Sequence, residues 1–168
     1  NGNANDDYVL TAGMQQVFVF APFVGWETVV NSVADFTGIE ACINLNLFQL
    51  NGNNVVGLIN LSSAKGVHIV YEDSMLQISN CNNLHTLITP DTTCRILIQN
   101  NYNLTTISFN TNTEFSEFIL TDNYSLESLD LSNNKPALMI NNQIQFMAQN
   151  NDNLKCLNLK SGFCFNWM

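Results

Sequence analysis

The sequence predicts a mainly β fold, a right-handed β-solenoid in which short units stack on one another. A similar segment returns four times in the second half of the chain, around Leu84, Leu104, Leu126 and Leu154. The spacings between these leucines, about 20, 22 and 28 residues, are typical of stacked repeat proteins. One such unit cannot bury its apolar face alone, so neighbouring units must cover it.

Two apolar strips in each unit support this architecture. The first is an alternating pair that precedes the leading leucine and puts both side chains on one face of a strand. The pairs are Leu76 and Ile78, Ile96 and Ile98, Phe118 and Leu120, and Phe146 and Ala148. The second strip starts at the leading leucine, as in Leu126-x-x-Leu129-x-Leu131. Each unit then offers roughly five apolar side chains, each worth about 1.5–3 kcal/mol when fully buried.

Asparagine occupies the bends between these strips. It makes up roughly one residue in six of the chain. Asparagine tolerates the left-handed conformation that tight turns need, and its amide bonds to nearby backbone groups. Amides at equivalent positions of stacked units can also bond to one another. A disordered, asparagine-rich segment is the alternative, but 46% of the chain is hydrophobic and the apolar positions are in register.

The pattern Leu-x-x-Leu-x-Leu-x-x-Asn resembles leucine-rich repeats. Residues 126–134 match it fully, and residues 104–112 match it with conservative replacements. The unequal unit lengths, and the apolar strand before each leading leucine, are more similar to the receptor L domain of insulin- and EGF-receptor ectodomains and of secreted nematode proteins. That resemblance covers about residues 26–165. It implies a β-solenoid that opens with a helix, a cysteine and a short first strand, here residues 26–36, Cys42 and residues 43–47.

The length of 168 residues favours a single domain. Residues 1–25 form an N-terminal strand segment, because Val17-Phe18-Val19-Phe20 has strong strand propensity. Residues 26–37 form a capping helix, since their apolar residues recur three and four apart, and Gly38 stops it by accepting a positive φ. Residues 42–160 form the solenoid coils, and residues 161–168 form a C-terminal cap.

Charge limits the partners. Charged residues make up only 11% of the chain, and the net charge is −9. Nucleic acid and anionic membrane surfaces would therefore repel the protein. No apolar run approaches the ~20 residues that a membrane-spanning helix needs. We therefore expect neither nucleic-acid binding nor membrane insertion.

Several features favour a secreted, extracellular protein. The chain begins without methionine, which indicates either a removed leader or a trimmed sequence. Three triplets match the glycosylation acceptor motif, at Asn60, Asn103 and Asn123, and the last two precede a leading leucine, where we expect a glycan to be accessible.

Five cysteines also fit an oxidising compartment. We expect Cys156 and Cys164, which bracket the end of the last unit, to form a disulfide that holds the C-terminal cap. Cys42, Cys81 and Cys94 cannot be paired from the sequence. In a cytosolic protein, all five would instead be small buried apolar residues.

The sequence contains no recognisable catalytic or metal-binding motif. His68 and His85 are the whole supply of histidine, and neither stands in a nucleophile motif. No cofactor or metal site is expected, because phosphate-binding glycine loops and zinc-ligand spacings are absent from the sequence. One outward strand face offers Asp130 among small neutral residues, which is too little for the paired carboxylates of a glycoside hydrolase. We therefore expect no enzyme.

The same outward face suits binding, although its residues could equally be ordinary solvated strand positions. The candidate binding residues, on a flat solenoid face, are Thr106, Ser108, Ser128, Asp130, Asn158 and Lys160. The favoured function is a secreted recognition domain for a protein or glycan partner. The alternative is an extracellular structural protein that binds copies of itself and forms fibres or matrix through apolar ends at residues 17–20 and 163–168.

Overall fold

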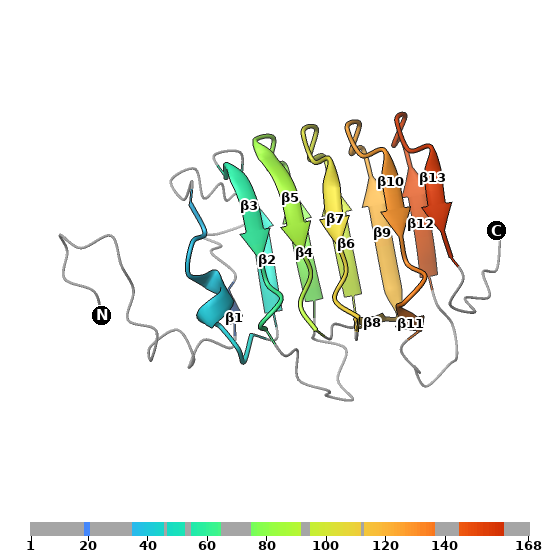
Figure 1. Ribbon diagram of the computed structural model, residues 1–168. Helices are drawn as coiled ribbons and strands as arrows, with labels where there is room; N and C mark the ends of the chain where they lie inside the picture. The colour runs from blue at the N-terminus through green and yellow to red at the C-terminus, as the bar shows by residue number, and fades with distance from the viewer. Residues whose placement is uncertain are drawn as a thin grey trace.

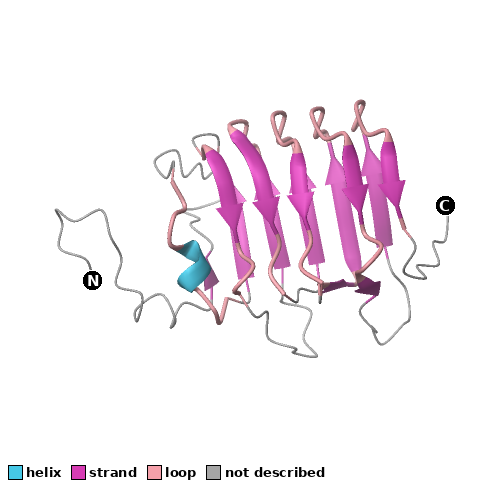
Figure 2. Ribbon diagram, in the orientation of Figure 1, coloured by secondary structure: helices cyan, strands magenta, loops and turns pink. Residues whose placement is uncertain are grey.

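The computed structural model describes residues 19–20, 35–45, 47–52, 55–64, 75–91, 95–111, 113–136 and 145–159. It is mainly β with parallel sheets, which confirms the coarse part of the predicted fold class (Figure 2). The longer strands are β2 (Leu47–Asn51), β3 (Gly57–Asn60), β4 (Met75–Ser79), β5 (Leu84–Ile88), β6 (Arg95–Gln99), β9 (Glu117–Thr121) and β12 (Gln145–Gln149). The shorter ones are β1 (Val19–Phe20), β7 (Thr106–Ser108), β8 (Glu114–Phe115), β10 (Ser128–Asp130), β11 (Lys135–Pro136) and β13 (Cys156–Asn158).

The strands lie in two layers (Figure 1). One layer is a six-stranded parallel sheet in the order β1-β2-β4-β6-β9-β12, which we call the six-stranded sheet. The other consists of the parallel sheet β3-β5-β7 and the parallel pair β10-β13, which we call the facing strands. A short parallel pair, β8 and β11, lies at the edge where the chain returns to the six-stranded sheet (Figure 1).

Each repeat unit gives one strand to each layer. The units pair as β4 with β5, β6 with β7, β9 with β10, and β12 with β13 along the chain. In the six-stranded sheet, Leu76 pairs with Ile96, Ile96 with Phe118, and Phe118 with Phe146. The predicted alternating strips are therefore aligned from one unit to the next.

The hydrophobic core lies between the two layers and contains both strips of the inner units, whereas Phe146, Leu154 and Leu159 of the last unit are partly buried and pack against it. Leu84, Leu104 and Leu126 are fully buried, and the backbone N–H of each donates to the carbonyl three residues earlier, as does that of Leu154. The four leading leucines thus occupy the same turn in neighbouring units, as the spacing predicts. Phe118 sits at the centre of an aromatic cluster and stacks on Phe146, with ring centroids 5.5 Å apart.

The turns before the leading leucines use asparagine in two roles. The first turn residue has a positive φ: Asn80 (58°), Asn100 (56°), Asp122 (58°) and Asn150 (54°). Asparagine and aspartate tolerate this left-handed conformation better than other side chains. The next residue points inward and forms a ladder, the asparagine ladder, made of Asn101, Asn123 and Asn151 with Cys81 at its start.

Each rung of the asparagine ladder satisfies backbone groups of the preceding unit. The Oδ1 atom of Asn123 accepts the backbone N–H of Asn101 at 3.2 Å, and its Nδ2 donates to the carbonyls of Ile98 and Thr121, both at 2.9 Å. Asn101 and Asn123 are fully buried. Buried backbone groups without partners are costly, so the ladder lets a tight turn lie inside the core.

The opposite edge of the core has its own buried polar contacts, which the sequence did not reveal. The hydroxyls of Thr89 and Thr113, both fully buried, lie 3.1 Å apart. Asn134, 1% exposed, donates from Nδ2 to the carbonyl of Asn110 at 3.1 Å. These contacts connect successive units at the point where the chain turns back.

The N-terminal predictions are partly tested. β1 pairs with β2 in parallel, which confirms a strand at Val19–Phe20. Most of the capping helix predicted at 26–37 lies outside the described residues, and its last three residues are not helical. Instead, Gly38, with a φ of 94°, precedes the short 3-10 helix η1 (Ile39–Ala41).

Residues 35–45, which we call the segment around η1, cover the N-terminal end of the core. Phe36, Ile39, Cys42 and Leu45 are buried, and the Phe36 ring meets the Phe48 ring edge-on at 6.0 Å between centroids. The residues of the predicted C-terminal cap, 161–168, lie outside the described part of the chain.

Candidate binding surfaces

Five of the six predicted binding residues lie together on the outer face of the facing strands. Thr106 and Ser108 are exposed on β7, and Ser128 and Asp130 are exposed on β10. Asn158 of β13 is half-buried and pairs with Asp130. Lys160 lies outside the described residues. We call this surface, made of Thr106, Ser108, Ser128, Asp130 and Asn158, the polar face.

The polar face has the chemistry of a hydrogen-bonding surface rather than of a catalytic centre. β10 and β13 pair in parallel, so equivalent side chains such as Asp130 and Asn158 lie on strands about 4.8 Å apart, whereas β7 belongs to a separate sheet. Four of its five residues offer neutral hydroxyl or amide groups. The one carboxylate, Asp130, accepts the backbone N–H of Ser132 at 2.8 Å. Such a surface can donate and accept hydrogen bonds, but it lacks the second carboxylate that acid–base hydrolysis requires.

The three glycosylation triplets differ in accessibility. Asn103 is exposed, and its Nδ2 donates to the carbonyl of Asn82 at 2.7 Å. Asn60 is half-buried, with Oδ1 accepting the N–H of Ser62 at 3.0 Å. The prediction of an accessible glycan at Asn123 is wrong, because its side chain is fully buried in the asparagine ladder. A glycan there would break the contacts on both sides of that rung.

The described cysteines lie in different environments. Cys156 is exposed on β13 and is free in the described part of the structure, and Cys164, its predicted disulfide partner, lies outside the described residues. Cys42 and Cys81 are free and buried, and Cys94 lies outside the described residues.

Burial also decides the chemistry of the two inner thiols. It raises the pKa of Cys81 to about 12, and burial followed by the nearby Glu40 carboxylate raises the pKa of Cys42. Both thiols therefore stay protonated at neutral pH and are poor nucleophiles.

The outer face of the six-stranded sheet is a second surface, which the sequence analysis missed. Leu97, Ile119 and Met147 pair in register across β6, β9 and β12 and are half-buried. Beside them, Arg95 and Glu117 form an ion pair. Triplets of consecutive apolar residues such as Ile96-Leu97-Ile98 could have indicated this surface. When the first and third residues of a strand triplet point into the core, the second must point outward.

Two tyrosines stack on the exposed edge formed by the turns. The rings of Tyr102 and Tyr124 are 5.3 Å apart between centroids, with 29° between their planes. The Tyr124 hydroxyl donates to Oδ1 of Asp122 at 3.2 Å. Partial desolvation, followed by this hydrogen bond and the Asp122 charge, raises the pKa of Tyr124. The phenol therefore stays neutral and can donate hydrogen bonds.

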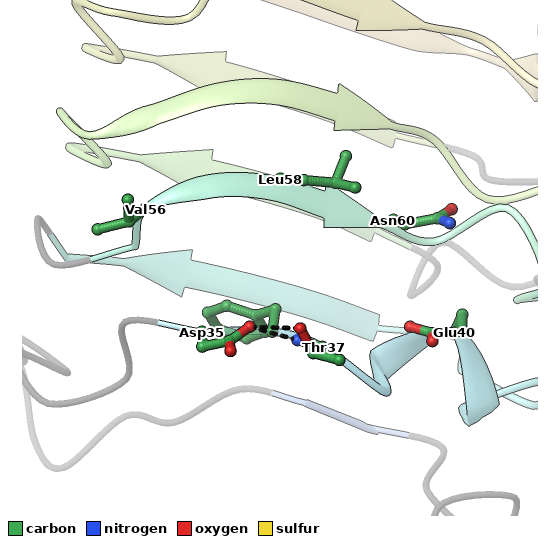
Figure 3. Close-up of a pocket in the computed structure, with 7 residues that line it drawn as sticks. Asp35, Thr37, Glu40, Val56, Leu58 and Asn60 are labelled. Atoms are coloured by element: carbon green, nitrogen blue, oxygen red, sulfur yellow. Dashed lines mark hydrogen bonds between the residues drawn. The ribbon is translucent and has the colours of Figure 1, made fainter.

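A groove of about 320 Å³ lies between β3 and the segment around η1 (Figure 3). Its walls are Asp35, Phe36, Thr37, Glu40, Val56, Leu58 and Asn60. The backbone N–H and hydroxyl of Thr37 donate to Oδ1 of Asp35 at 2.8 and 2.7 Å, and these bonds lower the pKa of Asp35. Glu40 accepts the N–H of Gly38 at 3.0 Å. No sequence motif marked this groove, because its two walls come from segments about 20 residues apart.

Comparison of the chain with protein-family models, with characterised proteins and with solved structures finds no match. The similarity to the receptor L domain therefore stays a prediction from sequence pattern. Within the described residues, no three histidine, cysteine, aspartate or glutamate side chains gather as a metal site would require. The same residues contain no helix long and apolar enough to span a membrane.

Proposed function

We propose that this protein is a secreted, non-catalytic recognition domain that presents the polar face to a protein or glycan partner. Its architecture in this proposal is a right-handed β-solenoid of irregular leucine-rich coils, similar to a receptor L domain. The in-register parallel strands and the buried column of leading leucines support that architecture. The segment around η1 takes the capping role at the N-terminal end, since Phe36 and Ile39 are buried there.

One observation carries the proposal of recognition. Thr106, Ser108, Ser128 and Asp130 are exposed, while Ile107 and Leu129 between them are buried in the core. The polar groups thus stand on a backbone that the core holds in place, so binding would cost little conformational entropy. Solenoid proteins commonly use extended sheet surfaces in this way.

The proposal of a non-catalytic domain rests on the same residues. The polar face carries one carboxylate, and the buried thiols of Cys42 and Cys81 stay protonated. His85 is exposed on β5, and its carbonyl accepts the hydroxyl of Thr105, the residue before β7, at 3.1 Å. A flat surface of this composition is suited to binding without turnover.

The test measures binding of the secreted chain to panels of immobilised glycans and of receptor ectodomains. We expect at least one saturable interaction that Ser108→Arg and Ser128→Arg each weaken by about tenfold, because a long charged side chain blocks the face. Gln145→Arg, an exposed change on the six-stranded sheet, is the control and should leave binding unchanged. Binding that is absent from both panels, or equally affected by all three variants, would count against a recognition role for the polar face.

Secretion has a separate test. The intact mass of protein recovered from the culture medium, before and after deglycosylation, reports whether the chain carries glycan, and peptide mass mapping of the asparagines converted to aspartate by deglycosylation reports which sites carry it. We expect glycan at Asn103 and none at Asn123, since only Asn103 is exposed. Failure of the protein to leave the cell, or glycan at Asn123, would contradict this part of the proposal.

A second function, self-association into extracellular fibres or matrix, is favoured by the C-terminal end of the sheets. Among the described strands, β12 and β13 are the last of their sheets, and Leu157 is 40% exposed where Leu129 of the preceding unit is 1% exposed. Open strand edges pair readily with another chain. Light scattering over a range of concentrations separates the two functions: ordered polymers without a partner support assembly, and a monomer at high concentration excludes it.

A further inference from the structure

We propose that the groove beside β3 is a second binding site, distinct from the polar face, which takes an extended peptide with basic and apolar side chains as an added strand. The site joins the edge of a sheet to two carboxylates and two exposed apolar side chains (Figure 3). The backbone of β3, the space next to it and the charge of its walls each point to this occupant.

The backbone of β3 can accept a further strand. Among the described strands, β3 lies at the edge of the sheet β3-β5-β7. The N–H of Gly57 donates to Asn83 at 3.1 Å and that of Leu61 donates to Ile88 at 3.0 Å, so the odd-numbered residues face β5. Because alternate residues of a parallel strand turn their backbone groups to opposite sides, Leu58 and Asn60 turn theirs toward the groove.

The two layers end differently on the side where the groove lies. In the six-stranded sheet, β1 continues the sheet beyond β2, with Val19 paired to Leu47 and Phe20 to Phe48. Beyond β3, the corresponding neighbour is the turn and 3-10 segment around η1, which is not a strand (Figure 1). Among the described residues, the facing strands therefore have one strand fewer at this end, and the groove lies where that strand would be.

The walls of the groove specify the side chains of the peptide. Val56 is 59% exposed and Leu58 is 47% exposed, so apolar side chains of an added strand would cover them. Asp35 and Glu40 supply two negative charges, and the Thr37 hydrogen bonds, by lowering the pKa of Asp35, keep it ionised at neutral pH. None of the seven lining residues is basic. Charge complementarity therefore selects lysine or arginine, and main-chain hydrogen bonds supply the affinity.

The experiment uses a fluorescent synthetic peptide of alternating lysine and valine, with fluorescence anisotropy as the readout. We expect saturable binding to the full chain that weakens as salt is added, because the ion pairs are partly exposed. A glutamate–valine peptide should not bind. The lysine–valine peptide with N-methylated backbone should not bind either, since it cannot pair with a strand edge.

Matched variants separate a specific site from general attraction to a chain of net charge −9. The double variant Asp35→Asn with Glu40→Gln should weaken binding by about tenfold. The control, Glu127→Gln with Asp152→Asn, removes two exposed carboxylates elsewhere and should leave binding unchanged. Leu58→Lys, at an exposed position, provides a second test and should also weaken binding, because it places a like charge beside the peptide.

Three outcomes would overturn the proposal. These are no saturable binding of the lysine–valine peptide, equal losses in the two double variants, or full binding of the N-methylated peptide. The result is independent of the polar face: Ser108→Arg should leave peptide binding unchanged, so either proposal can fail while the other stands. Circular dichroism and thermal unfolding of each variant confirm that it retains the fold.

Discussion

A middle repeat unit and the last described unit carry the same leucine pattern but bury it very differently. In the middle unit, Leu126 and Leu131 are fully buried and Leu129 is 1% exposed. In the last unit, Leu157 is 40% exposed, and Leu154 and Leu159 are only partly buried. The strip in the six-stranded sheet shows the same contrast, since Phe118 is fully buried and its partner Phe146 is not.

The comparison shows that burial in this fold is supplied by neighbours rather than by the unit itself. A middle unit lies between two others, whereas among the described residues the last unit has a neighbour on one side only. Stability in such proteins is approximately the sum of unit terms and nearest-neighbour contacts. Equivalent substitutions in the two units should therefore have unequal effects, and the following pairs of variants measure the difference.

The largest difference is expected between Leu126→Ala and Leu154→Ala. Removing the Leu126 side chain leaves a cavity between two units and should lower the free energy of unfolding by about 2–5 kcal/mol. At Leu154 the side chain is already partly exposed, so the loss should be clearly smaller, about half as large. Chemical denaturation of both variants beside the parent chain measures these values.

The two variants control for each other, because the residue type, the turn and the chemical change are the same. Equal losses would mean that the last unit is as well covered as the middle one. The open end inferred from Leu157 would then be absent in solution, and self-association through it would lose its support.

Aliphatic spacing predicted the stacked core correctly, because a repeat of leucines directly reflects contacts that recur from unit to unit. Leu84, Leu104 and Leu126 are buried as expected. The same pattern overestimated the burial of Ala148, which is exposed on β12. Local sequence says which face of a strand is apolar, but the presence of a covering neighbour is a property of the whole fold.

The polar groups were less predictable. The triplet at Asn123 indicated a surface residue, yet its amide is buried, where it satisfies two backbone groups of the preceding unit, in Asn101 and Ile98, and one of its own unit, in Thr121. Cys81, an apolar residue at the equivalent position, could have revealed that this position points inward. The groove beside β3 carried no signal at all, since its walls meet only after the chain has turned twice.

The next largest difference is expected between Asn123→Ala in the asparagine ladder and Asn153→Ala in the last unit. The first leaves the N–H of Asn101 and the carbonyl of Ile98 without their partner inside the core. Buried groups without partners cost roughly 1–3 kcal/mol, so the free energy of unfolding should fall by about that amount. Asn153 is exposed and water can replace its bond to the carbonyl of Tyr124, so its loss should be small.

Thermal and chemical unfolding of these two variants provide the measurement. Asn123→Asp sharpens it, because aspartate keeps an oxygen acceptor for Asn101 but loses the amide donors to Ile98 and Thr121. A substitution at Asn123 no more damaging than one at Asn153 would show that water reaches the ladder, and would contradict the conclusion that the ladder satisfies the backbone groups of a turn inside the core.

The smallest difference is expected between the two ion pairs. Arg95 and Glu117 pair on the six-stranded sheet, where their side chains are 41% and 18% exposed. Lys155 and Glu127 lie 3.8 Å apart near the last unit, with side chains 72% and 70% exposed. Solvent screening reduces both interactions, so Glu117→Gln should cost at most about 1 kcal/mol of unfolding free energy, and Glu127→Gln should change it too little to measure. Raising the salt concentration should reduce the effect of Glu117→Gln towards zero. A larger effect at Glu127 than at Glu117 would reverse the comparison, because it would place the stronger cross-unit contact at the open end of the protein.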